Sequence, residues 1–300
     1  MTLPPAAEIK RIVYLGTPVT AVAPLRALKE AGYEIVLVVT RPDRRRGRGA
    51  RLQPSPVKVA AQDLGITISD NLQALATVDA DIAVVVAYGE IIPAPFLQRM
   101  PMVNMHFSLL PRWRGAAPVE RAILNGDEVT GVCLMAVAEG LDTGPLYRQV
   151  RTKIDANEDS EMLQARLSAL GTKLMLEAFS AGLGSPEPQQ GEATYAAKLT
   201  SVDRHIDWRQ SALQIIRQIR VGGAWTTFRG QRFIIWRAKQ SEPVPKRGTP
   251  NLAPGSITEL TVATGDGHIE MVEVQTQGRT RQSADAWRNG VRPRADDRFW

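Results

Sequence analysis

Three polar side chains in this sequence have the types that acyl transfer to an amine requires. Asn104 and His106 lie two residues apart, and Asp142 lies in the run Gly-Leu-Asp-Thr-Gly. An amide donates hydrogen bonds to a developing oxyanion, an imidazole donates or carries a proton, and a carboxylate fixes the imidazole tautomer or accepts a proton. Spacing alone leaves a structural histidine at 106 and a turn-capping Asp142 as alternatives.

The elements that must position these residues have an α/β pattern. Apolar runs at 11–15, 35–39 and 82–87 predict strands, and leucine and alanine between residues 25 and 31 follow helical spacing. Strands that are apolar throughout are typical of a parallel sheet covered on both faces. We expect one more strand to end at His106, with Asn104 and His106 on the same face. Functional residues of such sheets gather at the carboxyl ends of the strands.

The chain changes character near residue 184. A helical pattern over 159–181 is followed by a stretch rich in glycine and proline at 182–191. Short strand patterns separated by Gly or Pro then recur up to residue 274, which predicts a small β-barrel. We therefore expect a domain at 1–183, a linker at 184–204 and a second domain at 205–300.

Positive charge is concentrated in two parts of the chain. Residues 1–200 contain 21 basic and 21 acidic side chains, whereas residues 201–300 contain 16 and 10. Residues 41–58 carry seven basic side chains and one acid among glycines and prolines, which predicts a mobile cationic loop. Both features favour a polyanionic partner, and a solvated charge run is the alternative for the loop.

Several classes of protein are disfavoured. The single cysteine, Cys133, lies in an apolar run and is expected to be a core residue. No second His or Cys lies at ligand spacing, so we expect no metal site. A glycine-rich phosphate loop is also missing, which disfavours nucleotide hydrolysis. No stretch of about 18 apolar residues and no signal peptide pattern is found, which predicts a cytoplasmic protein without membrane association.

Five segments resemble the methionyl-tRNA formyltransferase family, within the 10-formyltetrahydrofolate-dependent formyltransferases. They are Asn104-Met105-His106, residues 108–118 (SLLPRWRGAAP), Leu141-Asp142-Thr143-Gly144, Val86-Ala87-Tyr88-Gly89 and Pro54-Ser55-Pro56-Val57-Lys58. The resemblance implies a Rossmann-like N-terminal formyltransferase domain, a C-terminal domain of the OB type, and formyl transfer from 10-formyltetrahydrofolate to methionyl initiator tRNA. We expect the chain to act as a monomer.

The resemblance also implies residue roles. Asn104, His106 and Asp142 would be catalytic. The folate site would be lined by Ser108, Leu109, Leu110, Pro111, Tyr88 and Gly89. The basic positions of the tRNA-contacting loop would be Arg44, Arg48 and Lys58. The chain departs from the family at Phe107, where glycine is common, and at residues 221–225 (VGGAW), where the family often has an Asn-Pro-Trp-Pro-like stretch.

Three other functions remain open at this point. The first is a formyltransferase that acts on an amino-sugar nucleotide with the same three catalytic residues. The cationic loop argues against it, because a small sugar nucleotide does not need seven cations. The others are a non-catalytic RNA-binding protein, disfavoured by the joint presence of Asn104, His106 and Asp142, and a hydrolase of formyl-folate.

Overall fold

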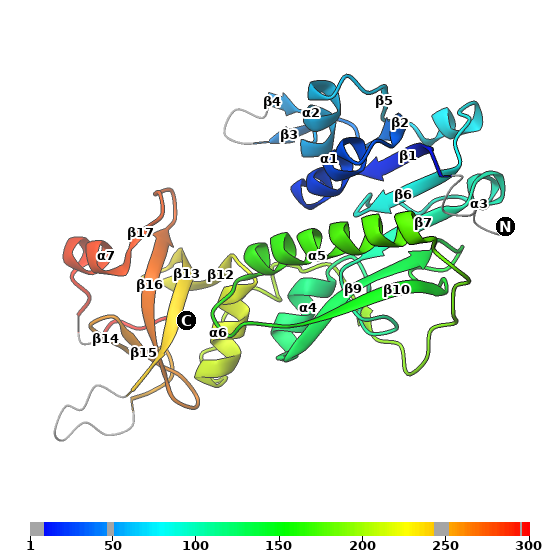
Figure 1. Ribbon diagram of the computed structural model, residues 1–300. Coiled ribbons are helices and arrows are strands. Elements are labelled where there is room, and N and C mark those ends of the chain that lie inside the picture. The colour runs from blue at the N-terminus through cyan, green and yellow to red at the C-terminus, as the bar shows by residue number, and fades with distance from the viewer. Residues whose placement is uncertain (1–8, 47–50, 243–251, 295) are drawn as a thin grey trace. The chain divides into compact units, whose positions relative to one another are not determined.

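The computed structural model describes residues 9–46, 51–242, 252–294 and 296–300, and its elements are shown in Figure 1. The chain forms two compact units. The first consists of Met1–Val119, Glu128–Ile154 and Met162–Ala197. The second consists of Glu120–Asp127, Asp155–Glu161 and Lys198–Trp300. The domain limits expected from the sequence stay a prediction.

A seven-stranded sheet is the framework of the first unit, in the order β10-β9-β7-β6-β1-β2-β5. Its strands are β1 Arg11–Gly16, β2 Glu34–Val39, β5 Ile68–Ser69, β6 Ile82–Val86, β7 Met102–His106, β9 Val129–Ala136 and β10 Leu146–Lys153. The five strands from β5 to β7 pair in parallel, which confirms the predicted α/β sheet. Strands β9 and β10 add an antiparallel edge. Most of β10 is polar (LYRQVRTK), so its sequence lacks the apolar run of the buried strands.

Among the described residues, the first unit contains the helices α1 Val22–Glu30, α2 Pro56–Asp63, α3 Ala94–Arg99 and most of α5 Ser160–Ala181, with 3-10 turns at Val19–Ala21 and Leu72–Ala76. Most of α4 Pro118–Asn125 belongs to the second unit. The long helix expected at 159–181 is therefore confirmed. It packs closely on the sheet at Gly171, where an added Cβ would lie 2.6 Å from Met105 Sδ and 2.9 Å from Val132 Cγ1. A larger residue at 171 would push α5 away from β7 and β9.

The described parts of the cationic stretch, 41–46 and 51–58, contain regular secondary structure. Strands β3 (Arg44–Arg46) and β4 (Arg51–Gln53) pair as an antiparallel hairpin, and α2 begins at Pro56. The Ser55 hydroxyl caps this helix by accepting a hydrogen bond from the Lys58 backbone N–H, while proline at the first position suits a helix start. The expectation of a loop through residue 58 was therefore wrong. The Pro-Ser-Pro run is a local indication of a helix start, but the interpretation of this stretch as a loop rested on its charges and did not use it.

The second unit is built on an antiparallel sheet in the order β12-β13-β16-β15-β14, with β17 beside β16. Its elements are β12 Ala224–Phe228, β13 Gln231–Ser241, β14 Ile257–Thr258, β15 Thr261–Ala263, β16 His268–Thr276, β17 Gln282–Ser283, α6 Ala212–Arg220 and α7 Ala284–Val291. Phe299 bridges Phe228 of β12, and Arg298 bridges Ser256 beside β14. The final residues thus join the two sheet edges, which gives the predicted barrel. Phe233, Trp287 and Phe299 are fully buried in its core.

Candidate active site

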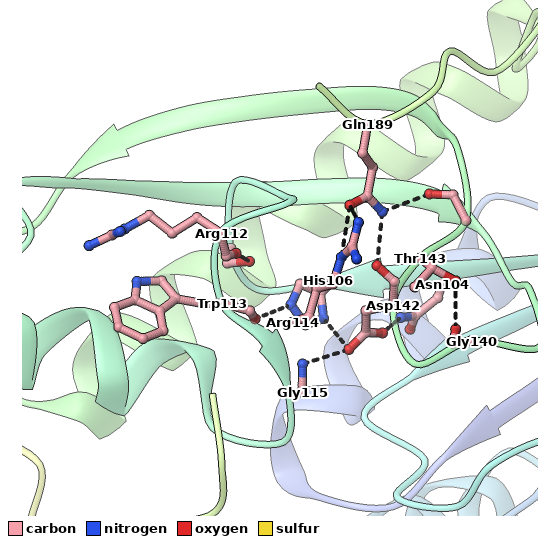
Figure 2. A network of polar contacts seen from close by, with 12 residues as sticks. Asn104, His106, Arg112, Trp113, Arg114, Gly115, Gly140, Asp142, Thr143 and Gln189 are labelled. Atoms are coloured by element: carbon pink, nitrogen blue, oxygen red, sulfur yellow. Dashed lines mark hydrogen bonds and ion pairs between the residues drawn. The ribbon is translucent and has the colours of Figure 1, made fainter. Parts of the chain in front are cut away.

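Asn104 and His106 lie on the carboxyl-terminal half of β7. Successive side chains of a strand alternate between faces, so residues two apart share one face. Both side chains reach the carboxylate of Asp142 (Figure 2). Across the antiparallel pairing, His106 stands opposite Cys133 of β9. Burial raises the pKa of the Cys133 thiol to about 11, which keeps it protonated and fits its expected role as a core residue.

Asp142 is presented by the tight loop that joins β9 to β10. Its φ of 51° is left-handed, a conformation that aspartate tolerates better than most residues. Gly144 follows where the backbone passes Ala136 so closely that a Cβ would lie 1.8 Å from the Ala136 carbonyl oxygen. The Thr143 hydroxyl closes the turn by donating to the Gly140 carbonyl at 3.0 Å. The two glycines singled out in the sequence thus flank a compact turn that directs Asp142 towards β7.

The Asp142 carboxylate is the hub of the cluster, and its side chain is 12% exposed. Oδ1 accepts a hydrogen bond from Asn104 Nδ2 at 3.4 Å, and Oδ2 accepts one from the Gly115 backbone N–H at 2.8 Å. His106 Nδ1 lies 3.6 Å from the same Oδ2. Asn104 and Asp142, 38 positions apart in the chain, and His106 are therefore brought together beside β7 as the sequence predicts.

The imidazole of His106 has a partner that the sequence did not indicate. Its Nε2 lies 2.9 Å from the Trp113 carbonyl oxygen, and because a carbonyl only accepts, Nε2 carries the hydrogen. The Nδ1 atom then faces Asp142. In this arrangement both ring nitrogens face oxygen atoms of the protein, so His106 must give up one of these contacts before it can donate to a substrate. Trp113 adopts a φ of 64°, which is strained for a bulky residue and points its carbonyl at His106.

The loop after β7 contains four of the residues expected to line a folate site. Ser108 is fully buried and its hydroxyl donates to the Arg112 carbonyl at 2.6 Å, so this hydroxyl holds the turn together. Leu110 packs against Cys133 and Met135 of β9, and its peptide bond to Pro111 is cis. Phe107, the departure from the family pattern, is buried. A larger side chain thus fits at 107 within the core.

Tyr88 and Gly89, the other expected folate residues, follow β6, the strand next to β7. Burial raises the pKa of the Tyr88 hydroxyl, which donates to Glu90 Oε2 at 3.2 Å. The Thr17 hydroxyl, just beyond β1, donates to the Tyr88 carbonyl at 3.0 Å. Three parallel strands therefore end side by side in the manner that the sequence predicts.

Residues 187–196 belong to the site, although their composition predicts a linker. Glu187 and Leu146 exchange two backbone hydrogen bonds at 2.7 and 2.8 Å, and β11 (Tyr195–Ala196) pairs with β8 (Arg114–Gly115). Between these anchors, the Gln189 side chain contacts the backbone of Asp142 and the guanidinium of Arg114 (Figure 2). The sequence does not indicate a role for Gln189, because neither its residue type nor its neighbours differ from those of an ordinary surface linker.

The expected tRNA-binding residues lie apart from this cluster in the chain and differ in environment. Arg44 is exposed on β3. Lys58 lies in the first turn of α2, where its Nζ forms an ion pair with Asp43 at 2.7 Å. Arg48 lies outside the described residues. Arg41, at the start of the same stretch, is paired with Glu90. The cationic stretch is thus partly neutralised by carboxylates, and Arg44, Arg45 and Arg51 of the hairpin are exposed.

Within the described part of the chain, no three His, Cys, Asp or Glu side chains gather closely enough to hold a metal ion. The helices of this part also include none with the length and hydrophobicity needed to cross a bilayer.

Comparisons with known proteins identify both parts of the chain. The Formyl transferase family profile matches residues 10–179, and that of the Formyl transferase C-terminal domain matches 198–292. The methionyl-tRNA formyltransferase of Ruegeria pomeroyi is 41% identical over 298 residues, covering 93% of this chain and 97% of that protein. That of Acidothermus cellulolyticus is 39% identical over 322 residues, with coverage of 96% and 99%.

Solved structures show the same fold at lower identity. An N-formyltransferase from Helicobacter canadensis in complex with folinic acid and dTDP-3-aminofucose has a TM-score of 0.67 at 18% identity, covering 88% of this chain and 99% of that one. A methionyl-tRNA formyltransferase from Clostridium thermocellum has a TM-score of 0.58 at 18% identity, with coverage of 80% and 96%. The methionyl-tRNA formyltransferases named above are about 40% identical to this chain over nearly its whole length, whereas the N-formyltransferase bound to an amino-sugar nucleotide is 18% identical. The chain therefore belongs to the methionyl-tRNA formyltransferase family.

Proposed function

We propose that this protein transfers the formyl group of 10-formyltetrahydrofolate to the α-amino group of methionyl initiator tRNA. The observation that carries the proposal is the convergence of Asn104 and His106 of β7 on the carboxylate of Asp142. The identity of the acceptor rests on the relatives, which match both domains. Folate and tRNA are thus the two substrates.

The attacking amine needs no nucleophile from the enzyme. An α-amino group with a pKa of about 7.7 to 8 keeps a neutral fraction at neutral pH. Its lone pair forms the new bond to the formyl carbon while the carbonyl electrons move to oxygen, which produces a tetrahedral oxyanion. Asn104 directs one N–H at Asp142 and donates the other to the oxyanion. His106 adds a second donor once its Nε2 exchanges the Trp113 carbonyl for the substrate.

Collapse of the intermediate reforms the carbonyl and breaks the bond to N10 of the folate. The amine loses one proton and N10 gains one, so a single proton moves across the site. Asp142 accepts the amine proton directly or through water, with His106 beside it as the second proton-carrying group. The reaction is a direct transfer without a covalent enzyme intermediate.

We also propose the substrate contacts that the family resemblance implies. The folate site is formed by Ser108, Leu109, Leu110, Pro111, Tyr88 and Gly89. The tRNA is contacted by Arg44, Arg48 and Lys58. To bind a phosphate, Lys58 gives up its ion pair with Asp43.

The proposed domains are a catalytic domain at 1–183, a linker at 184–204 and a tRNA-binding domain at 205–300. The protein acts as a monomer in the cytoplasm, where tRNA is aminoacylated.

The decisive experiment offers the enzyme two acceptors at once. Methionyl initiator tRNA and a dTDP-linked amino sugar are incubated with limiting 10-formyltetrahydrofolate, and the formylated products are quantified by mass spectrometry. We expect the formyl mass to appear on the methionyl group and not on the sugar. Preferential formylation of the sugar would identify a sugar formyltransferase, and release of formate without either product would identify a hydrolase.

A further inference from the structure

We propose that Gln189 is a positioning residue for formyl transfer, which acts by holding Asp142 and the segment around Arg114 in register. This inference rests on the proposed function. Gln189 lies on the segment 187–196, far along the chain from the residues it contacts. Its amide lies between the loop of Asp142 and the guanidinium of Arg114 (Figure 2).

All hydrogen-bonding positions of this amide are used. Nε2 donates to the carbonyl oxygens of Asp142 and Gly144, at 2.8 Å each. Oε1 accepts from Arg114 Nε at 3.1 Å and from Arg114 Nη2 at 2.6 Å. A primary amide offers two donors and two acceptor lone pairs, and only this orientation satisfies all four partners. Neither glutamate nor an apolar side chain of equal length can make the same set of bonds.

The two segments that Gln189 joins supply the groups around the catalytic pair. One carries Asp142 itself. In the other, Arg114 is flanked by Trp113, whose carbonyl accepts from His106 Nε2, and by Gly115, whose N–H donates to Asp142 Oδ2. A displacement of Arg114 relative to Asp142 therefore lengthens both of these contacts. Gln189 sets the geometry of Asp142 and His106 without touching the reacting atoms.

The segment that presents Gln189 is itself anchored on both sides. Before it, Glu187 pairs with Leu146 of β10. After it, Thr194 accepts from the Trp113 backbone N–H through its hydroxyl at 2.9 Å and from the Arg114 N–H through its carbonyl at 2.9 Å. Because the backbone is fixed at both ends, the side chain of Gln189 acts as a rigid link.

The test replaces Gln189 by methionine, which keeps the length and removes every hydrogen bond. We expect kcat on methionyl-tRNA to fall roughly 10- to 100-fold, since displacement of catalytic groups by about 1 Å costs up to about 100-fold. The KM values for folate and tRNA should change less than about threefold, because the bound surfaces are unaltered. The pH profile of kcat should also move, because the contact between Asp142 and His106 changes.

The matched control is Gln190→Met, the same substitution at the exposed neighbouring glutamine, which should behave as wild type. Gln189→Glu is the second variant, because it keeps an acceptor for Arg114 but turns an oxygen towards the two carbonyls. It should also lose kcat. The inference is overturned if both Gln189 variants keep kcat within about twofold of wild type, or if kcat falls with an unchanged pH profile and an equal loss in the control. An inactive wild-type enzyme would instead refute the proposed function.

Discussion

Asp142 shows how much of the site depends on one side chain. Its Oδ1 accepts a hydrogen bond from Asn104 Nδ2, and its Oδ2 accepts one from the Gly115 N–H and also faces His106 Nδ1. A single carboxylate thereby orients an amide that can bind an oxyanion and an imidazole that can hold a proton. The glycine-flanked turn and the positive φ of Asp142 are the structural conditions for this arrangement.

We predict that Asn104→Ala and Asp142→Asn each lower kcat by about 100- to 1,000-fold, the usual loss for one donor of an oxyanion site. Asn104→Ala removes the donor. Asp142→Asn removes the charge beside His106 and turns an NH2 group towards one of the two donors that Asp142 accepts from, the Gly115 N–H or Asn104 Nδ2. Initial rates with charged initiator tRNA provide the measurement. Asp79→Asn, at a carboxylate 89% exposed, is the control and should be neutral. Turnover near wild type in both site variants would remove these residues from the catalytic role.

At the scale of elements, side-chain hydrogen bonds determine the conformation of turns for which the hydrophobic pattern predicts no structure. In the second unit, Asp203 Oδ2 accepts from the Thr200 N–H at 2.7 Å and from its hydroxyl at 2.8 Å. Its Oδ1 accepts from Arg121 of α4 at 2.8 Å. These contacts, the Thr200 N–H first, lower the pKa of Asp203 to about 2. The carboxylate thus ties the turn at 200–203 to a helix some 80 residues earlier.

We predict that Asp203→Asn lowers the free energy of unfolding at pH 7 by about 1 kcal/mol, a value reduced by solvent screening. Because the folded pKa lies below the unfolded value of about 3.9, the stabilisation is complete above that pH and is lost as pH falls towards 2. Urea unfolding of both proteins between pH 7 and pH 2.5 measures this. A difference that stays constant over that range would show that the charge of Asp203 is not responsible.

At the scale of the whole molecule, charge separates the two substrates. The excess of basic residues lies in 201–300, and exposed arginines extend along the β3–β4 hairpin. The cluster around Asp142 is half-buried or buried and carries few uncompensated charges. Phosphates bound by arginine release counterions, whereas binding to the proposed folate site, with its buried Ser108 and Leu110, involves no phosphate.

We predict that tRNA binding weakens steeply with salt and that folate binding does not. Raising salt from 50 to 200 mM should increase the KM for methionyl-tRNA roughly tenfold or more, and that for folate less than about twofold. Arg44→Gln should reduce the slope of log affinity for tRNA against log salt by about 1, which is the contribution of a single phosphate contact. Steady-state kinetics at four salt concentrations measure both slopes. Equal salt dependence for the two substrates would contradict this division of charge.

The sequence by itself determined the class of fold and the placement of Asn104 and His106 on one face of β7. Apolar runs of five or six residues specify buried parallel strands, and a spacing of two on a strand places Asn104 and His106 on one face. These features depend on neighbours in the chain, so their patterns are visible without a structure. The charge of residues 41–58 favours a polyanionic partner, and a carboxylate at 142 suits proton transfer. The identification of that polyanion as tRNA and the assignment of Asp142 to catalysis came from resemblance to a family.

The tertiary structure alone decided what surrounds those residues. The Trp113 carbonyl occupies His106 Nε2, Asp43 neutralises Lys58, and Gln189 joins Asp142 to Arg114 across separations of 47 and 75 residues. Such contacts are made by single polar atoms, which leave no periodic pattern in the sequence. They depend on the path of segments such as 187–196, which overlaps a stretch rich in glycine and proline at 182–191. That composition is equally compatible with a linker and with a segment packed beside Asp142 and Arg114.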